Sequence, residues 1–448
     1  MLHLVIQPHM STFSMKLNGS THTAMTMLES RCTQSLKCLE FTHNTNLPPQ
    51  YFSNFLGHFK NLTKLNVCAS MVDDCSFIII GENCSKLVEL NAASTWLTNN
   101  GLKGMSVDDV IIPGLPTIYR LPNLVLIDVS DTRVTPEGLS LFLVCHPNLV
   151  KLEHRENFHS FRLAKIQNSC NSTYALRYLS SIDVYLSPDD YEYALDHCPR
   201  LEGVTLTCAG LTNENLYKLM TVKSLTQLHL GNKNSQSFNF FEGVAPVLAE
   251  VGVTLKKLVL EDFTEVDVDF IGEKCPMLEH LALSGILTYA PMGNNYKPHF
   301  FTKLTSLELW NKIGQNHELA VSDNVLIQLL FRAPLTYLLL QRVGSLTDDL
   351  FSMILGMNPL LTLRNVVIDY CHNVSGKIFW MLLEHPNNLS VMRSWHNKGT
   401  TETDKNAIKS VIKEENLLLY WEWYPYNEYE ELLDAGQIRL ESDEEEYE

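Results

Sequence analysis

Leucine recurs along most of this chain in a short motif with the order Leu-x-x-Leu-x-apolar. A clear early copy runs from Leu62 to Val67, and a clear later copy runs from Leu201 to Leu206. Further copies begin at Leu87, Leu124, Leu225, Leu255, Leu278, Leu304 and Leu335. Many starts lie about 23 to 31 residues apart, which is typical of repeats in which one strand and one helix bury their apolar faces against neighbouring repeats.

One repeat shows the elements that each copy is expected to contain. Period-two alternation from Leu201 to Leu206 predicts a short strand, and Gly210 then marks a turn. Thr212 is a suitable N-cap for a helix that carries Leu216 and Leu219 on one face. The chain is therefore expected to run strand, turn, helix and return, many times over.

Cysteines mark the start of several repeats. Cys198 and Cys275 each precede a proline and stand three residues before the strand leucine, and Cys208 follows the first of these strands. This pattern resembles the cysteine-containing class of leucine-rich repeats, which is found above all in F-box/leucine-rich-repeat substrate receptors of cullin-type ubiquitin ligases. The resemblance covers residues 28–395.

The repeats and the resemblance together predict an α/β leucine-rich-repeat solenoid of about twelve to fourteen repeats. Short parallel strands are expected on its concave face and helices on its convex face. Residues 1–27 are interpreted as an N-terminal segment in the form of a truncated repeat, residues 28–426 as the solenoid, and residues 427–448 as an acidic, largely disordered tail. Irregular spacing predicts three insertions, near residues 104–122, 231–243 and 286–300.

The resemblance implies a substrate-recognition subunit, or a truncated relative of one, in an SCF ubiquitin ligase that acts in ubiquitin-dependent protein degradation. Such receptors carry a helical F-box before their repeats, which docks the ligase adaptor. No F-box is recognisable in the 27 residues before the solenoid. The alternative hypothesis is therefore a free-standing scaffold or inhibitor protein with no ligase attachment.

The formal charge of −17 is concentrated at the carboxyl end. Residues 428–448 contain ten acidic side chains against Arg439, a net of −9, which leaves −8 for the rest of the chain. Neither part shows the Lys/Arg stripe that binds phosphates, so nucleic acid and membrane surfaces are not expected as partners. We expect a protein partner, with the chain itself a monomer within a complex.

The 11 cysteines include no Cys-x-x-Cys pair, and the chain begins without a secretory leader. Reduced thiols and a cytoplasmic or nuclear location follow as expectations. We find no nucleophile elbow, no phosphate-binding glycine loop and no His-Glu-x-x-His motif, so no enzyme activity, cofactor or metal is predicted.

One short segment resembles the box that binds elongin C in another class of cullin ligase receptor. It has the form Leu28-x3-Cys32-x3-Leu36. The same three residues also fall where the first repeat needs a helix end and a boundary cysteine. The structural interpretation is therefore favoured.

The side chains between the motif leucines point away from the helices, because successive strand residues face opposite sides of a sheet. In the early repeats these positions are mainly polar and hold Lys64, Asn66, Glu89, Asn91, Asp128, Lys151 and Glu153. In the later repeats they include His280, Ala282 and Glu308, and aromatic and aliphatic residues become more common.

An exposed aromatic and aliphatic cluster is typical of a protein-binding hot spot. We hypothesise that such a cluster anchors a protein partner in the carboxyl half of the chain. Its members would be Trp310, Tyr337, Leu339, Val367 and Tyr370. The alternative is that the tail or an insertion folds back over these residues.

Overall fold

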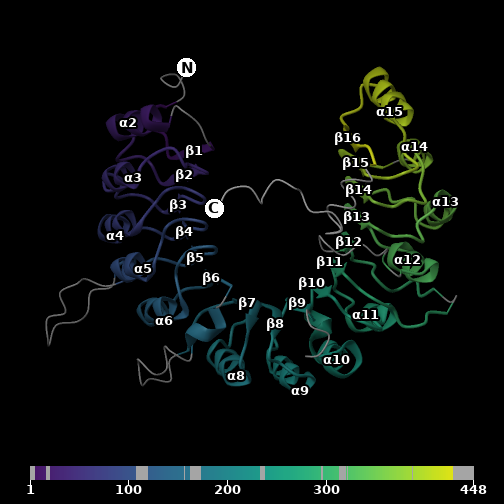
Figure 1. The fold of residues 1–448 in the computed structure, drawn as a ribbon, viewed down its shortest axis with the longest axis horizontal. Coiled ribbons are helices and arrows are strands. Elements are labelled where there is room, and N and C mark those ends of the chain that lie inside the picture. Colours follow the sequence, from purple (N-terminus) through teal and green to yellow (C-terminus); the bar gives the residue numbers. More distant parts are fainter. Residues whose placement is uncertain are drawn as a thin grey trace, which may run out of the picture. The chain divides into compact units, whose positions relative to one another are not determined.

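The computed structural model describes residues 6–16, 21–106, 120–155, 157–161, 173–232, 238–293, 296–311, 319, 321–385 and 387–426. Contacts divide the chain into two compact units, Met1–Gly210 and Leu211–Glu448. In each unit the strands form a parallel sheet in chain order, and the helices cover one face of that sheet (Figure 1). The predicted α/β leucine-rich-repeat solenoid is confirmed. We call the sheet face that carries no helices the strand face.

Unit 1 begins its sheet inside the segment that the sequence analysis sets apart as residues 1–27. Its strands are β1 Thr12–Lys16, β2 Cys38–Thr42, β3 Lys64–Asn66, β4 Glu89–Asn91, β5 Leu126–Asp128, β6 Lys151–Glu153, β7 Tyr178–Tyr185 and β8 Gly203–Ala209. Its helices are α2 Thr21–Arg31, α3 Pro49–Leu56, α4 Asp74–Asn83, α5 Asn99–Ser106, α6 Pro136–Cys145 and α8 Pro188–His197.

Unit 2 continues the same alternation. Its strands are β9 Gln227–Gly231, β10 Lys257–Glu261, β11 His280–Ser284, β12 Ser306–Trp310, β13 Tyr337–Gln341, β14 Asn365–Asp369, β15 Val391–Trp395 and β16 Tyr420–Tyr424. Its α-helices are α9 Asn213–Leu216, α10 Ala245–Val251, α11 Val268–Lys274, α12 Asp323–Leu330, α13 Asp348–Met357, α14 Lys377–Glu384 and α15 Glu402–Glu414. Single turns of other helix types occur at Tyr217–Thr221, Phe240–Val244 and Gly252–Thr254.

The described part of the chain thus contains sixteen strands, more than the twelve to fourteen repeats expected. The additional strands are those in which other residues stand at motif positions. In β7 the last apolar position is Ser181, and in β15 the last two are Met392 and Ser394. These side chains are buried, as leucine would be, because the position in the repeat decides the burial.

The predicted insertions and tail lie partly or wholly outside the described residues. This applies to residues 107–119 of the first insertion, 233–237 of the second, 294–295 of the third and all of the tail, 427–448.

Motif leucines stack in register from strand to strand. Leu281 lies between Leu258 and Leu307 in the sheet of unit 2, and all three side chains are fully buried. Each such side chain contributes about 1.5 to 3 kcal/mol by leaving water. Because each repeat covers the leucines of its neighbours, the core continues through every repeat of a unit.

Each strand is commonly followed by a turn whose backbone is left-handed. The turn residue lies seven positions after the first motif leucine, as at Ala69, Asp131, Arg342 and His396, whose φ angles are 53°, 53°, 55° and 52°. Most of these residues are not glycine, so each turn costs about 1 kcal/mol of backbone strain. Hydrogen bonds to the neighbouring repeat offset this strain and fix the turn. For example, the Ala69 N–H donates to the Ala93 carbonyl at 2.9 Å.

His146 is a buried titratable residue at the end of α6. Its ring packs on Phe142 with centroids 4.1 Å apart, only 5% of it is exposed, and neither ring nitrogen has a hydrogen-bond partner in the described part of the chain. Burial lowers the pKa of His146 from 6.5 to about 4. The ring is therefore neutral in the folded protein at neutral pH.

We expect His146 to make the fold sensitive to acid. Between pH 6.5 and about pH 4 the unfolded chain binds a proton at this position that the folded chain does not, so the free energy of unfolding falls as the pH decreases. The loss from this residue approaches about 3 kcal/mol at the lower end of that range. Urea unfolding at pH 7 and pH 4.5 measures it. His146→Leu is expected to flatten the dependence, and an unchanged pH slope in that variant would contradict this account.

Candidate functional site

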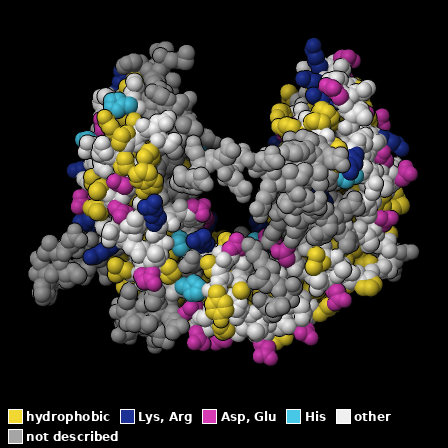
Figure 2. All heavy atoms as spheres, in the orientation of Figure 1, with side chains coloured by type: hydrophobic (Ala, Val, Ile, Leu, Met, Phe, Trp, Pro, Cys, Tyr) yellow, Lys and Arg dark blue, Asp and Glu magenta, His cyan; other side chains and the backbone are white. Residues whose placement is uncertain are grey.

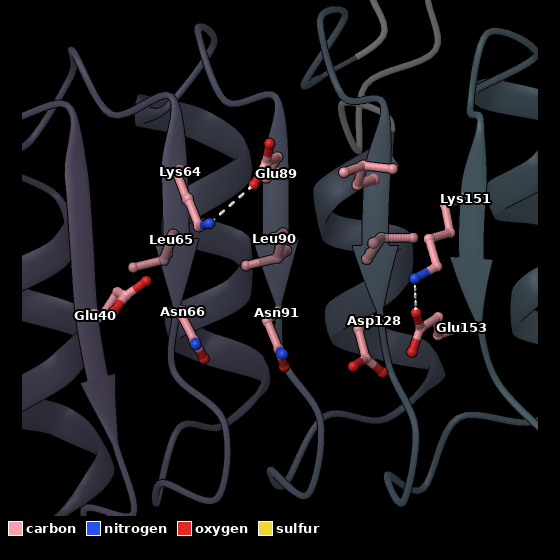
Figure 3. A pocket seen from close by; sticks show the side chains of 12 residues that line it. Glu40, Lys64, Leu65, Asn66, Glu89, Leu90, Asn91, Asp128, Lys151 and Glu153 are labelled. Carbon is pink, nitrogen blue, oxygen red and sulfur yellow. Dashed lines mark ion pairs between the residues drawn. The ribbon is translucent and has the colours of Figure 1, made fainter. Parts of the chain in front are cut away.

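The strand face of unit 1 contains a polar hollow of about 210 Å³ (Figure 3). The register aligns one row of side chains across β2 to β6, namely Glu40, Asn66, Asn91, Asp128 and Glu153. A second row across β3 to β6 contains Lys64, Glu89, Leu126 and Lys151. The seven polar residues that the sequence predicted on this face all line the hollow, so this part of the prediction is confirmed.

Three neighbouring members of the first row are held by the same hydrogen bond. Oδ1 of Asn66 accepts from the backbone N–H of Cys68 at 3.1 Å, and Oδ1 of Asn91 accepts from Ala93 at 3.0 Å. Oδ1 of Asp128 accepts from the backbone of the residue two positions later at 3.0 Å. One side-chain oxygen of each residue is therefore fixed at the turn. The amide N–H groups of the two asparagines and the second oxygen of Asp128 point away from that turn.

The charges of the hollow are only partly compensated. Lys64 Nζ lies 3.3 Å from Glu89 Oε2, and Lys151 forms an ion pair with Glu153. Within the described residues, no ion pair neutralises Glu40 or Asp128. Four carboxylates therefore face two ammonium groups, and the hollow has a net charge of −2.

Two half-buried thiols respond to this charge. Burial raises the pKa of Cys38, and the Glu40 carboxylate raises it further, while Lys64 opposes the change. Burial likewise raises the pKa of Cys68, with a further increase from Asp128. Both thiols are therefore mainly protonated at neutral pH, and the local field on this face is negative.

The strand face of unit 2 holds the five residues proposed as partner anchors. Trp310 ends β12, and Tyr337 and Leu339 lie in β13; all three are half-buried and keep some exposed surface. Val367 in β14 is 2% exposed and Tyr370 is 4% exposed. The structure thus presents three of the five residues at the surface and buries the other two beside them.

Tyr370 occupies the left-handed turn after β14, with φ of 49°, and side chains from the neighbouring repeats bury its ring. Its ring stacks on the ring of His396 with centroids 4.5 Å apart, and the guanidinium of Arg342 lies 4.3 Å from its centroid. His396 Nδ1 in turn lies 3.0 Å from an oxygen of Asp369. These contacts make Tyr370 part of the packed rim of the sheet.

Polar groups beside the three exposed anchors are partly desolvated. Burial raises the pKa of Glu308, which pairs with Leu339 in the sheet, and lowers the pKa of His280 to about 4. The indole N–H of Trp310 is buried without a hydrogen-bond partner in the described part of the chain.

No group of three or more potential metal ligands occurs among the described residues. The ten cysteines that the structure describes are free, and burial raises the pKa of Cys84 and Cys275 to about 12 each. The Leu28-x3-Cys32-x3-Leu36 segment is fully buried at its three motif positions, as its structural interpretation requires. None of the described helices is both long enough and apolar enough to cross a membrane.

Figure 2 shows acidic and basic side chains interspersed on the described surface that faces the viewer, without a continuous basic stripe.

No protein-family model matches the chain, and no curated protein matches it. It is similar to a chain in the crystal structure of the Rad7 and Elc1 complex in yeast, with a TM-score of 0.52 and 15% identity over 86% of this chain and 85% of that chain. It is also similar to an internalin, InlF, from Listeria monocytogenes, with a TM-score of 0.35 and 13% identity over 82% of this chain and 81% of that one. A leucine-rich-repeat protein of Leptospira interrogans gives a TM-score of 0.36 and 14% identity over 92% of this chain and 90% of the other. The first of these similarities supports the fold.

Proposed function

We propose that this chain is a non-catalytic interaction module that holds a protein partner on its strand face. The observation that supports this proposal is the cluster of Trp310, Tyr337 and Leu339 on β12 and β13, which keeps apolar surface exposed on a rigid sheet. Tyrosine and tryptophan provide large contact areas at low conformational cost, and they are enriched at the centres of protein interfaces.

The two buried members of the original cluster act as supports. Val367 pairs with Leu339 in the sheet, and Tyr370 is fixed between Arg342 and His396. A rigid underlying layer means that the three exposed side chains lose little freedom on binding. Preorganisation of this kind increases affinity without adding contacts.

We further propose that the partner is a substrate delivered to a cullin-type ubiquitin ligase, with this chain as the recognition subunit. Two observations favour this role over the free-standing scaffold: the Cys-Pro-x-Leu pattern at Cys198 and Cys275, and the likeness in fold to a chain of the Rad7 and Elc1 complex. The scaffold or inhibitor role requires no adaptor and remains the second candidate.

Co-purification under native conditions separates these two roles. If the chain is a ligase subunit, a tagged copy is expected to recover cullin and its adaptor together with any substrate. Recovery of a partner on the strand face without cullin or adaptor would reject the ligase role and favour the scaffold. Mass spectrometry of the eluate identifies the recovered chains.

A further inference from the structure

We infer that the strand face of unit 1 binds an extended segment of a protein partner that carries two basic side chains four residues apart. This inference rests on the proposed function, because it assigns chemistry to part of the surface that holds the partner. It depends on the residues that line the hollow between β2 and β6 (Figure 3).

The two uncompensated carboxylates lie in one row of the sheet. Glu40 is on β2 and Asp128 is on β5, with Asn66 and Asn91 at the same register on β3 and β4. Three strand spacings of about 4.8 Å separate the two carboxylates, which gives about 14 Å. Four residues of an extended chain span about 13 to 14 Å, and residues i and i+4 face the same side. An extended segment that crosses the strands therefore places its basic side chains over both carboxylates.

The lysines of the hollow do not prevent this arrangement. Lys64 lies 3.3 Å from Glu89 in the second row, and Lys151 forms an ion pair with Glu153 at the end of the first row, so both ammonium groups already have carboxylate partners. Among the four carboxylates of the hollow, Glu40 and Asp128 are thus the two that remain available to charges on a partner. Electrostatic complementarity then selects a basic segment and fixes its register.

The two asparagines specify what lies between the basic side chains. Their Oδ1 atoms are occupied by backbone N–H groups at 3.1 Å and 3.0 Å, so each Nδ2 remains as a donor towards a bound segment. A side chain with an acceptor, such as Gln, Asn or Thr, at position i+2 meets these donors. The recognised pattern is therefore basic-x-polar-x-basic.

A labelled peptide of sequence Gly-Ser-Arg-Thr-Gln-Thr-Arg-Ser-Gly tests the inference by fluorescence anisotropy with the full chain. We expect saturable binding at low salt that weakens as salt screens the charges. A peptide with both arginines replaced by glutamate is expected not to bind. A third peptide with the two arginines adjacent is expected to bind more weakly, because it reaches only one carboxylate.

The variant Glu40→Gln with Asp128→Asn should weaken binding by about tenfold. The fold should be retained, since Asn66 and Asn91 make the same turn hydrogen bond that Asn at position 128 would make. The matched control is Asp349→Asn with Glu414→Gln, which removes two exposed charges from helices of unit 2 and should leave the affinity within about twofold.

Three results would overturn the inference: equal affinity in the Glu40→Gln, Asp128→Asn variant, equal binding of the glutamate peptide, or no binding of the arginine peptide to the wild type at about 1 mM. The Trp310→Ala, Tyr337→Ala variant distinguishes failure of this inference from failure of the proposed function. It should bind the arginine peptide as the wild type does while losing the protein partner. If the peptide fails but protein capture through Trp310 and Tyr337 persists, only the present inference falls.

Discussion

Replacing Trp310 and Tyr337 with alanine is expected to abolish capture of a protein partner while leaving the melting curve nearly unchanged. Both side chains are half-buried on the strand face, and removing each deletes an aromatic contact area from the interface. Hot-spot residues of this type contribute about 2 kcal/mol or more each, so the double variant should lose about 1,000-fold in affinity. The measurement is surface capture of the co-purified partner by wild type and variant.

A matched control comes from the same residue types elsewhere in the chain. Trp96 and Tyr185 lie in unit 1 and are 49% and 64% exposed. Their replacement with alanine removes equivalent aromatic surface, and we expect capture to be retained. If the Trp310 and Tyr337 variant still captures the partner, the anchor assignment is wrong.

Replacing Phe351 with alanine is expected to destabilise unit 2 by about 4 kcal/mol. Phe351 lies on α13 and is fully buried, so its removal deletes aromatic contacts and leaves a cavity between repeats. Urea unfolding followed by tryptophan fluorescence measures the change, because Trp310, Trp380 and Trp395 report on the same unit.

Met353 provides the control on the same helix. It is two positions away and 48% exposed, so Met353→Ala should change the free energy of unfolding by less than about 0.5 kcal/mol. A loss below about 1 kcal/mol for Phe351→Ala would show that the repeats do not share a packed core, since a cavity of this size in a rigid interior costs more.

The spacing of leucines was sufficient to predict the fold and the face on which the intervening side chains lie. Asn66, Asn91 and Asp128 were placed on one surface by alternation alone, because a strand has only two faces. Their shared hydrogen bond to the residue two positions later was not predicted. An Asx residue at the same position in successive repeats was the available signal.

The leucine motif did not identify strand positions at which a different residue has the same structural role. Ser394 stands at a leucine position of β15, and its buried hydroxyl accepts a hydrogen bond at 3.0 Å from Asn397. Asn397 also donates to the carbonyl of Ile368 at 2.8 Å and accepts from the N–H of Cys371 at the same distance. A polar network of this kind replaces apolar packing, and no hydrophobic pattern can detect it.

The exposure of individual side chains on the strand face could not be predicted from alternation. Val367 and Leu339 occupy equivalent positions in neighbouring strands, yet Val367 is 2% exposed and Leu339 is half-buried. Leu339 lies between Glu308 and Val367 in the sheet, whereas Val367 lies between Leu339 and Arg393, so the two positions have different neighbours. Tyr370 is buried because His396 and Arg342 pack against its ring, and a tyrosine at that turn position gives no sequence signal for these contacts.

The central claim is that the strand face holds the partner, and site-specific photo-crosslinking tests it most directly. A photoreactive amino acid placed at Tyr337 on β13, or at Met353 on α13 on the helix side of the same repeat, reports which surface touches the captured protein. We expect an intermolecular crosslink from position 337 and none from position 353. A crosslink from position 353 with none from position 337 would place the partner on the helices and contradict the account.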